Sequence, residues 1–439
     1  MSEVTRQDPE ALARRGRYSW VEACVWTDRM LAALENGVKG GKWFSLIDKV
    51  YAPRTLEAAW KRVAGNKGAA GVDRISVERF AGRAERYLEE ISQALCREDF
   101  AVSPVRRVYI PKGGGERRPL GIPTVKDRVV QTALKLVLEP IFEKEFAAES
   151  YGFRPGRSAK DALRRVDGLL KAGYSWIVDA DLERYFDTIE HDRLMQEVER
   201  KVSDGSVLTL IRRYLKQEVL SGMESWTPTQ GTPQGAVLSP LLANIYLHPM
   251  DERLRQSGYE MVRYADDFVV LCRSEAEAQA ALGVIRSHCD AYGLTLHPEK
   301  TKLGNCLVPG QGFDFLGYHF EAGRRWVRKK SRRSIRDRIR DKTKRTCGRS
   351  LDQIIGVLNP MLRGWFAYFK HANAREFRTM DGFVRRRLRA VLCKQQKRPG
   401  HGATWLDHRQ WPNAFFAERG LFTCLQAYTL ASQSRCGNT

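Results

Sequence analysis

Hydrophobic and polar positions recur along the chain with two different periods, so both helices and strands are expected. The helical period predicts helices over 55–65, 126–142, 192–202, 206–217, 240–255, 275–292, 331–346, 351–370 and 375–395. Residues 1–45 are also expected to be helical, because their larger apolar side chains recur at roughly helical spacing, at Trp20, Val21, Val25, Trp26 and Met30.

Short apolar runs bounded by glycine and proline predict the strands. Residues 105–123, "VRRVYIPKGGGERRPLGIP", are typical of two strands around a glycine-rich turn. Residues 174–189 begin as an apolar strand and continue as a helix, 261–271 form a second apolar run, and 313–320 form a late strand. We therefore expect an α+β fold for the first 320 residues and an all-α region after them.

With 439 residues the chain exceeds one ordinary core, so two or three structural units are expected. No stretch of about 18 residues is both uncharged and predominantly apolar, which argues against a membrane span. The N-terminus has no apolar secretion signal. The nine cysteines form no Cys-x-x-Cys pair, which argues against a zinc ribbon or disulfide framework and fits a reducing cytoplasm.

The positive charge is concentrated in one part of the chain. The sequence has 74 Lys and Arg against 52 Asp and Glu, a net charge of +22. Residues 321–439 contain 28 basic and 8 acidic residues, so this region carries +20 and residues 1–320 carry only +2. Because concentrated charge repels itself, a polyanionic partner is the expected reason for it. A solvated basic face without special function is the alternative.

Carboxylates interrupt two of the apolar strands. "MVRYADDFVVL", 261–271, contains Asp266 and Asp267, and "WIVDADLERYFD", 176–187, places Asp179 and Asp181 on one strand face. Since burying a carboxylate without a partner is costly, a shared cation is an expected reason, and hard oxygen ligands favour Mg²⁺ over zinc. Two such ions support phosphoryl transfer. The alternative is an ordinary turn or surface pair, and the pattern alone identifies no reaction.

Three motifs around these carboxylates resemble reverse transcriptases. "YADD", 264–267, resembles the palm β-hairpin motif of that family, and "DLERYFD", 181–187, resembles its other metal-binding motif. "GTPQGAVLSPLLANIYL", 231–247, resembles the motif between them, which lies along the incoming nucleotide and the template.

Further blocks are similar to one branch of that family, the bacterial group II intron reverse transcriptases. They are "NKGAAGVD", 66–73, "PKGGGERRPLGIP", 111–123, and "YGFRPGRSAKDAL", 151–163. "LNPMLRGWFAYFKHA", 358–372, resembles the maturase (thumb) domain of the same proteins. Together the blocks span about residues 43–395, so the resemblance covers most of the chain.

The resemblance implies a right-hand polymerase, with fingers and palm, followed by an all-α basic thumb. The expected parts are a helical extension over 1–45, fingers over 46–173, palm over 174–320, a thumb or maturase domain over 321–398 and a short extension over 399–439. The last part lacks the His, Asn and paired-Cys pattern of the nuclease domain that some relatives carry, so we expect no endonuclease.

The resemblance also assigns the carboxylates. Asp181 and Asp266 match the principal metal ligands, and Asp267 matches the third acidic residue of the catalytic group. The backbone carbonyl of Leu182 would complete the metal shell, and two Mg²⁺ ions are the implied cofactor. Asp179 has no catalytic match and is interpreted as a strand-edge residue.

Six further residues match positions that contact the incoming dNTP. Lys112 and Arg118 would hold the triphosphate, although Arg117 is adjacent and an ordinary exposed hairpin is the alternative. Phe186 would exclude ribonucleotides by blocking the 2′-hydroxyl, with a core role, or Tyr185 in its place, as alternatives. The remaining matches are Gln234 and Gly235 in a nucleotide-contacting turn and Lys300 near the active site.

Nucleic-acid contacts are expected from the basic segments. Arg154 would either contact template phosphate or brace the fingers. In 324–345 and 383–398, arginines accompany an apolar stripe, which suits packing on one side and phosphate on the other. The candidates are Arg328, Lys329, Arg332, Arg333, Arg336, Arg340, Arg363, Arg385, Arg386, Arg387 and Arg389.

The resemblance therefore implies an RNA-directed DNA polymerase that also binds its group II intron RNA, assists splicing and supports retrohoming. The implied partners are intron RNA, an RNA template with a DNA primer, a DNA target and dNTPs, with no membrane partner. The implied location is the bacterial cytoplasm, with nucleoid association during integration. The alternatives are a free-standing relative serving defence or DNA repair, and an RNA-binding splicing factor without polymerase activity, against which the intact acidic residues argue.

Overall fold

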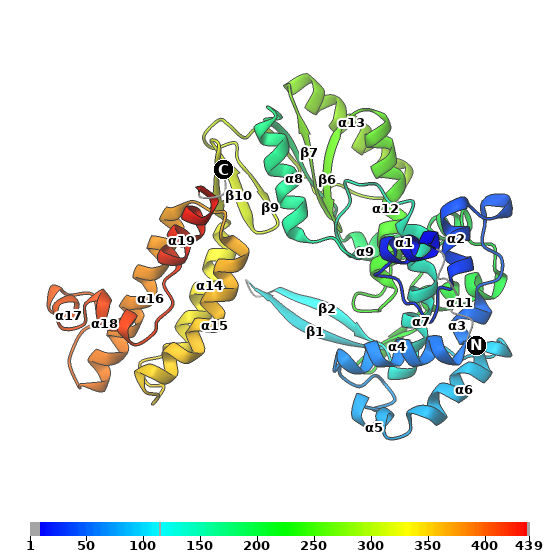
Figure 1. Ribbon diagram of the computed structural model, residues 1–439, viewed down its shortest axis with the longest axis horizontal. Helices are drawn as coiled ribbons and strands as arrows, with labels where there is room; N and C mark the ends of the chain where they lie inside the picture. The colour runs from blue at the N-terminus through cyan, green and yellow to red at the C-terminus, as the bar shows by residue number, and fades with distance from the viewer. Residues whose placement is uncertain (1–8, 114–115, 437–439) are drawn as a thin grey trace, which may run out of the picture. The chain divides into compact units, whose positions relative to one another are not determined.

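The computed structural model describes residues 9–113 and 116–436 (Figure 1). Two compact units divide the chain. The first unit comprises Met1–Leu169, Ala180–Leu271 and Ala276–Lys302, and the second comprises Leu170–Asp179, Cys272–Glu275 and Leu303–Thr439. In the part of the chain that is described, no helix combines the length and hydropathy needed to cross a bilayer.

The first unit begins with a series of helices that precede α7 (Val125–Glu143). They are α1 (Pro9–Arg17), α2 (Asp28–Asn36), the 3₁₀ helix η1 (Lys39–Gly41), α3 (Ile47–Tyr51), α4 (Pro53–Gly65), α5 (Val77–Ala81) and α6 (Ala84–Cys96). Residues 1–45 contain the helices α1 and α2, as predicted, but Trp20, Val21, Val25 and Trp26 lie in the turns between them and not on a helix. There the indole N–H of buried Trp26 donates to the Leu136 carbonyl of α7 at 3.0 Å.

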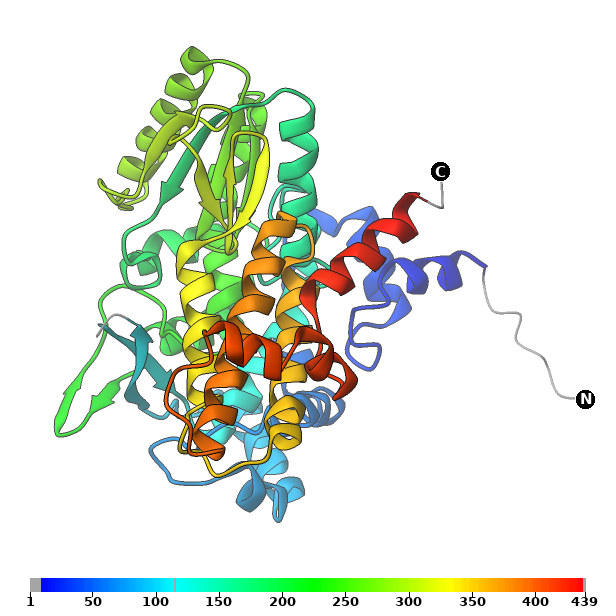
Figure 2. The same ribbon diagram turned by 90° about the vertical axis from the view of Figure 1, so that its left-hand side faces the viewer.

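The predicted hairpin over 105–123 is present. Strands β1 (Val105–Gly113) and β2 (Glu116–Ile122) pair antiparallel, and β4 (Val219–Ser221) joins β1 in parallel. With β5 (Glu224–Trp226) they form a four-stranded sheet of order β2-β1-β4-β5. Figure 2 shows the green β4–β5 hairpin projecting beside β1 and β2.

A second four-stranded sheet, of order β6-β7-β3-β8, carries the acidic motifs. Its strands are β3 (Trp176–Asp181), β6 (Glu260–Tyr264), β7 (Asp267–Cys272) and β8 (Lys302–Asn305). The chain between residues 159 and 291 also forms the helices α8 (Ala159–Lys171), α9 (Tyr185–Thr188), α10 (His191–Glu199), α11 (Gly205–Leu215), α12 (Ser239–Gln256) and α13 (Glu275–Ala291). Residues 268–271 of β7 are fully buried, which explains the apolar run around the two aspartates.

In the second unit a small antiparallel sheet precedes the helices. It contains β9 (Phe313–Phe315), β10 (Tyr318–Glu321) and β11 (Arg324–Val327). The single strand predicted over 313–320 is therefore two strands, separated by Leu316 and Gly317, whose φ angles are 46° and 83°. Beyond residue 320 the chain is helical as predicted, apart from β11.

The helices of the second unit form the C-terminal region. They are α14 (Lys329–Lys342), α15 (Leu351–Phe369), α16 (Ala374–Gln395), α17 (Trp405–Gln410), α18 (Asn413–Glu418) and α19 (Cys424–Cys436). Helix α14 packs against α15, and α19 packs against both α15 and α16. The stripe Ile354, Leu358, Leu362 and Trp365 of α15 is buried, so its aromatic end belongs to the core.

Candidate active site

The structure brings together two of the three predicted carboxylates. Asp181 is the last residue of β3, and Asp266 lies in the two-residue turn between β6 and β7. Burial raises the pKa of the Asp266 carboxyl above its usual range, and the nearby charge of Asp181 raises it further, while Arg118 opposes the shift. The carboxylates of Asp181 and Asp266 therefore lie close to each other, with the Arg118 guanidinium nearby.

Lys300 lies at the same site, as predicted. Its Nζ donates to Oδ2 of Asp181 at 2.8 Å, and the two side chains remain about half exposed, at 58% and 44%. A short antiparallel contact explains this position. Leu182 bridges Leu296, and the His297 amide donates to the Asp181 carbonyl at 2.8 Å. The turn after His297 then returns Lys300 towards the carboxylate.

A buried arginine, Arg263, supports the turn that carries Asp266. Arg263 and Asp251 are both fully buried, and Nε of Arg263 donates to Oδ1 of Asp251 at 2.7 Å. Nη1 of Arg263 donates to the Ala265 carbonyl at 2.9 Å and to Oδ1 of Asn244 at 3.0 Å. Because Ala265 has a φ of 61°, which is unfavourable for a residue with a Cβ, this turn needs such support.

A neighbouring segment closes on the same turn. The backbone of Tyr151 and that of Glu149 pair with Arg263, and Nδ2 of Asn244 donates to the Gly152 carbonyl at 2.9 Å. A Cβ on Gly152 would lie 2.1 Å from the Ala265 nitrogen, so only glycine fits there. The "YGF" block thus supports the catalytic turn through its backbone.

Arg154 differs from the nucleic-acid contact that was expected. Its guanidinium is buried, pairs with Glu143 at 2.7 Å and donates to the Ser150 carbonyl at 2.8 Å. These contacts leave the side chain no path to a phosphate. Arg154 therefore braces the segment before Tyr151, which was the alternative interpretation of this residue.

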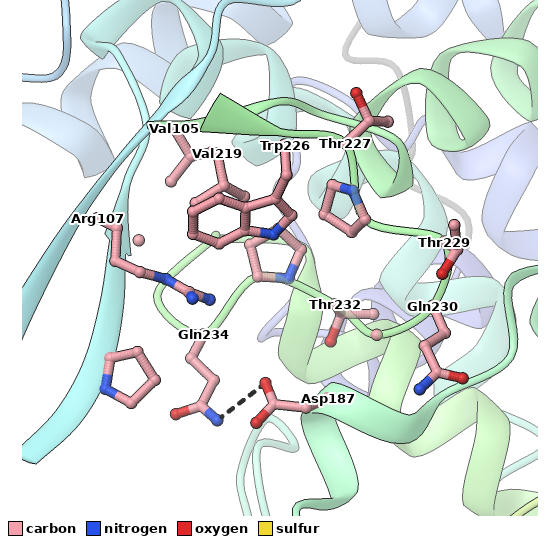
Figure 3. Close-up of a pocket in the computed structure, with 15 residues that line it drawn as sticks. Val105, Arg107, Asp187, Val219, Trp226, Thr227, Thr229, Gln230, Thr232 and Gln234 are labelled. Carbon is pink, nitrogen blue, oxygen red and sulfur yellow. Dashed lines mark hydrogen bonds between the residues drawn. The ribbon is translucent and has the colours of Figure 1, made fainter. Parts of the chain in front are cut away.

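The predicted triphosphate residue Arg118 is linked to the predicted nucleotide turn. Its Nε donates to Oε1 of Gln234 at 2.9 Å, and Gln234 Nε2 reaches Oδ1 of Asp187 at 3.5 Å (Figure 3). Gly235 has a φ of 105°, and a Cβ there would lie 2.6 Å from the Gly121 carbonyl. The close Gly121 carbonyl therefore requires a glycine at position 235, independently of any ligand. Lys112 is the next-to-last residue of β1, and its side chain lies outside the described residues.

The structure separates the two candidates for the sugar-facing ring. Tyr185 is buried, with its hydroxyl donating to the Ala243 carbonyl, so it belongs to the core. Phe186 packs edge-on against Tyr185 at 5.4 Å and is only partly covered. Phe186 is therefore the ring that remains available to a ligand.

Comparison with known proteins agrees with the motifs. Residues 110–320 match the family described as reverse transcriptase (RNA-dependent DNA polymerase), and residues 332–411 match the group II intron maturase-specific domain. Protein YkfC of Escherichia coli is 33% identical, over 65% of this chain and 84% of that protein. The chain belongs to the group II intron reverse transcriptases. The two domains are those of an RNA-directed DNA polymerase that also assists splicing.

Two further relatives of this group II reverse transcriptase are intron proteins. The group II intron-encoded protein LtrA of Lactococcus lactis is 38% identical over 46% of this chain and 34% of its own length. An uncharacterized 91 kDa protein in the cob intron of Schizosaccharomyces pombe is 30% identical over 68% of this chain and 47% of its own length. The chain thus spans half or less of these two relatives.

Enzymes of this family use divalent metal ions. Among the described residues no group of three or more His, Cys, Asp or Glu side chains is arranged to hold a metal ion, so Asp267 does not complete a ready three-carboxylate set. The pair Asp181 and Asp266 still fits a hard cation, because both supply oxygen ligands and their like charges repel. The Lys300 ammonium already occupies one oxygen of Asp181.

The predicted phosphate contacts of the maturase region fall into three groups by their exposure. Lys329, Arg333, Arg340, Arg363 and Arg386 are exposed. Arg328, Arg332 and Arg387 are partly covered and bound to Asp314, Glu376 and Thr343 respectively, and Arg336 and Arg385 are also partly covered. Arg389 differs from expectation, because it is buried and donates to the Trp411 carbonyl at 2.9 Å. It therefore binds the C-terminal segment of the protein and not a phosphate.

The supporting residues Arg263, Asp251 and Asn244 were not predicted from the sequence. One signal was available. Arg263 interrupts an apolar strand just as the aspartates do, and Asn244 and Asp251 lie seven residues apart on one face of α12, with Asn244 inside its apolar segment 241–247. Buried polar residues on two apolar elements indicate a mutual contact.

Proposed function

We propose that the chain extends a DNA primer on an RNA template at the site formed by Asp181 and Asp266. The observation that carries the proposal is the approach of these two carboxylates beside Arg118 and Lys300. Two Mg²⁺ ions would be held by Asp181, Asp266 and the Leu182 carbonyl, with Asp267 as a further ligand. Bound there, the ions would supply charge stabilisation for the attacking and leaving oxygens.

The chain's own residues would position the nucleotide. Arg118, oriented by Gln234, offers a guanidinium to the triphosphate, and Lys112 would add a second cation. Phe186 would lie against the sugar and exclude a 2′-hydroxyl. Lys300 would leave Asp181 when the metal binds and neutralise charge on the departing pyrophosphate.

The basic C-terminal region would bind the nucleic acids. Its exposed cations, such as Lys329, Arg333 and Arg340, would contact the phosphates of intron RNA and of the template–primer duplex. Holding the folded intron would assist splicing, and copying it after insertion into a DNA target would support retrohoming. We place this activity in the bacterial cytoplasm, with nucleoid association during integration.

A primer-extension assay on an RNA template with dNTPs and Mg²⁺ tests the proposal. Asp266→Ala should lower the extension rate on the order of a thousandfold or more, because it removes a group on which chemistry depends. Asp179→Asn is the matched control, since Asp179 precedes Asp181 by two residues on the same strand and should change the rate little. Equal extension by the wild type and Asp266→Ala would contradict the proposal.

The same assay with ribonucleotides tests the role of Phe186. Phe186→Val should lower the preference for dNTPs over NTPs by roughly 10- to 200-fold, because a smaller side chain leaves room for the 2′-hydroxyl. The measured quantity is the ratio of kcat/KM for the two nucleotides. Unchanged sugar discrimination would remove Phe186 from this role.

A further inference from the structure

The most exposed tryptophan among the described residues lies on α17, in the second unit. Trp405 is the first residue of that helix and is 70% exposed, and Leu406 beside it is 57% exposed (Figure 1). The other nine tryptophans are at most 36% exposed, as is usual for a large apolar ring. Because a ring in water gains none of the free energy that burial provides, the position of Trp405 indicates a ligand.

Helix α17 is fixed at both of its ends. At its start, the Thr404 amide donates to Oδ2 of Asp407 at 3.0 Å, and the Asp407 amide donates to Oγ1 of Thr404 at 3.2 Å. Asp407 is 2% exposed and also accepts from Sγ of Cys393, on α16, at 3.3 Å. After the last residue of the helix, the carbonyl of buried Trp411 accepts from Arg389 of α16. The helix therefore cannot turn its exposed face inward.

The segment before α17 is fixed as well. Gly402 has a φ of 71°, and a Cβ there would lie 2.4 Å from the Ala390 nitrogen, so this segment runs directly over α16. Nδ1 of His401 lies 3.1 Å from Nη1 of Arg345, which follows α14. The exposed face of α17 is thus preformed, and a ligand would bind without first having to order this part of the chain.

Cations surround the exposed ring. The Arg409 guanidinium carbon lies 5.4 Å from the centre of the Trp405 ring, one helical turn further along the same face. Residues 394–411 contain four Lys and Arg, and the one acidic residue among them, Asp407, is buried and already bound. The charge therefore suits a polyanion and disfavours a second copy of this chain, which would bring the same charge.

We propose that Trp405 is a stacking platform for an unpaired base of the intron RNA, and that Arg409 binds a phosphate next to that base. This inference rests on the proposed binding of intron RNA by the C-terminal region. Folded RNA displays unpaired bases in loops and bulges, and proteins bind such bases on aromatic rings. A DNA target that is double-stranded keeps its bases stacked, so RNA is the favoured source. Helix α17 also lies within residues 332–411, the range of the maturase-specific domain.

Stacking can be separated from phosphate binding by its response to salt. Phosphate contacts weaken as the salt concentration rises because they release counterions, whereas a stacked base contributes no such release. Trp405→Ala should therefore lower RNA affinity at every salt concentration and leave the slope of log binding constant against log salt unchanged. Arg409→Ala should reduce that slope by about 0.7–0.9.

Binding of the full chain to three labelled probes, measured by fluorescence anisotropy, tests the proposal. The probes are an RNA hairpin with a seven-nucleotide loop, a fully paired RNA duplex with the same number of phosphates, and the DNA version of the hairpin. Trp405→Ala should weaken binding to the RNA hairpin about fivefold to a hundredfold and leave duplex binding unchanged. Trp405→Phe should restore most of the loss. Val357→Ala is the matched control and should change neither, because Val357 is an exposed apolar side chain on α15 of the same unit.

Abasic nucleotides throughout the RNA loop should abolish the difference between the wild type and Trp405→Ala. An equal loss on the duplex, or no loss on the RNA hairpin, would overturn the proposal. So would a larger loss on the DNA hairpin than on the RNA hairpin, which would assign the ring to the DNA target. A wild type that binds the loop through Trp405 but does not assist splicing would reject the proposed splicing role alone.

Discussion

Arg263 in the first unit and Arg333 in the second show two different uses of one side chain. Arg263 has no exposed surface and donates to Asp251, Asn244 and the Ala265 carbonyl. Arg333, on α14, is 86% exposed, and the nearest oxygen of Asp337 is 3.9 Å away. The first arginine has a complete set of partners within the fold, whereas the second is left for solvent or a ligand.

The two uses follow from the cost of burying charge. A buried guanidinium must have its donors satisfied, so it fixes the atoms that accept from it, here the turn before Asp266. An exposed pair such as Arg333 and Asp337 contributes little to stability and holds no geometry. The net charges agree, since residues 1–320 carry +2 and residues 321–439 carry +20. In residues 1–320, called the body below, buried charges fix the geometry of the fold. In residues 321–439, the basic region, exposed charges are available to bind phosphate.

Arg389 shows that position in the sequence does not decide which use applies. It lies within the basic helix α16, yet it is 2% exposed and donates to the Trp411 carbonyl and to Asn413. A count of arginines in the maturase region therefore overestimates the number of phosphate contacts. The partners of each guanidinium decide whether it serves the fold or a ligand.

The largest expected effect comes from breaking the buried pair in the body. Arg263→Met should lower the free energy of unfolding by about 3–5 kcal/mol, because it leaves the Asp251 charge buried without a partner. The double variant Arg263→Met with Asp251→Leu should recover most of that loss. Both should lower primer extension by roughly 10- to 100-fold, since the Ala265 carbonyl loses its support in each. Denaturant unfolding and extension rates across a Mg²⁺ titration measure the two effects.

The double variant decides between a structural and a positioning role for Arg263. If it is stable and extends primers at the wild-type rate and the wild-type Mg²⁺ requirement, the network serves stability alone. A stable variant that needs more Mg²⁺ for half-maximal extension would show that the network positions Asp266.

A smaller effect is expected from removing exposed charge in the basic region. Replacing Lys329, Arg333 and Arg340 together with alanine should reduce the slope of log binding constant against log salt by about 2–3 on RNA, because each phosphate contact contributes about 0.7–0.9. The unfolding free energy should change little, since these side chains are exposed. Fluorescence anisotropy over a salt series measures the slope.

Two matched controls sharpen this comparison. Replacing the exposed Arg86, Arg97 and Arg164 of the body changes the net charge equally and should leave the slope almost unchanged. Arg389→Met should lower stability and leave the slope unaffected, because its guanidinium faces the C-terminal segment. An equal fall in slope for the body triple would mean that net charge, not location, controls RNA binding.

Periodicity predicted the helices well where a single face is buried. Helix α4 ends at Gly65, as its apolar spacing and terminal glycine indicated, and begins at Pro53, two residues before its predicted start. The helical prediction failed for residues 20–26, because Trp26 is buried by a contact with Leu136, 110 residues away, and not by a helical neighbour. Local spacing does not distinguish a turn packed on a core from a helix.

The candidate site was predictable to the extent that its residues break a local pattern. Asp181 and Asp266 were found because charged residues in apolar strands are costly without a function. Their supports were missed because Asn244, Asp251 and Gly152 meet Arg263 and its turn only after α12 and the "YGF" segment have folded against β6. Arg154 was left open between two roles, and only its burial decides for the bracing one.

The smallest expected effect concerns a buried histidine of the body. His288 is 2% exposed and stacks on Tyr292 at 4.2 Å. Burial lowers the pKa of His288 to about 4, and the nearby Arg253 and Arg193 lower it further. Because the folded state holds the ring neutral, stability is complete above the unfolded pKa of about 6.5 and is lost as the pH falls towards 4.

From pH 7 to pH 5 this single group should remove about 2 kcal/mol of unfolding free energy. His288→Phe keeps a ring against Tyr292 and removes the titration, so its stability should fall by about that much less over the same range, as measured by denaturant unfolding at both pH values. His408→Phe, at an exposed position of the basic region, is the control and should retain the wild-type pH dependence. The same pH dependence in the wild type and His288→Phe would show that the buried ring does not titrate with unfolding.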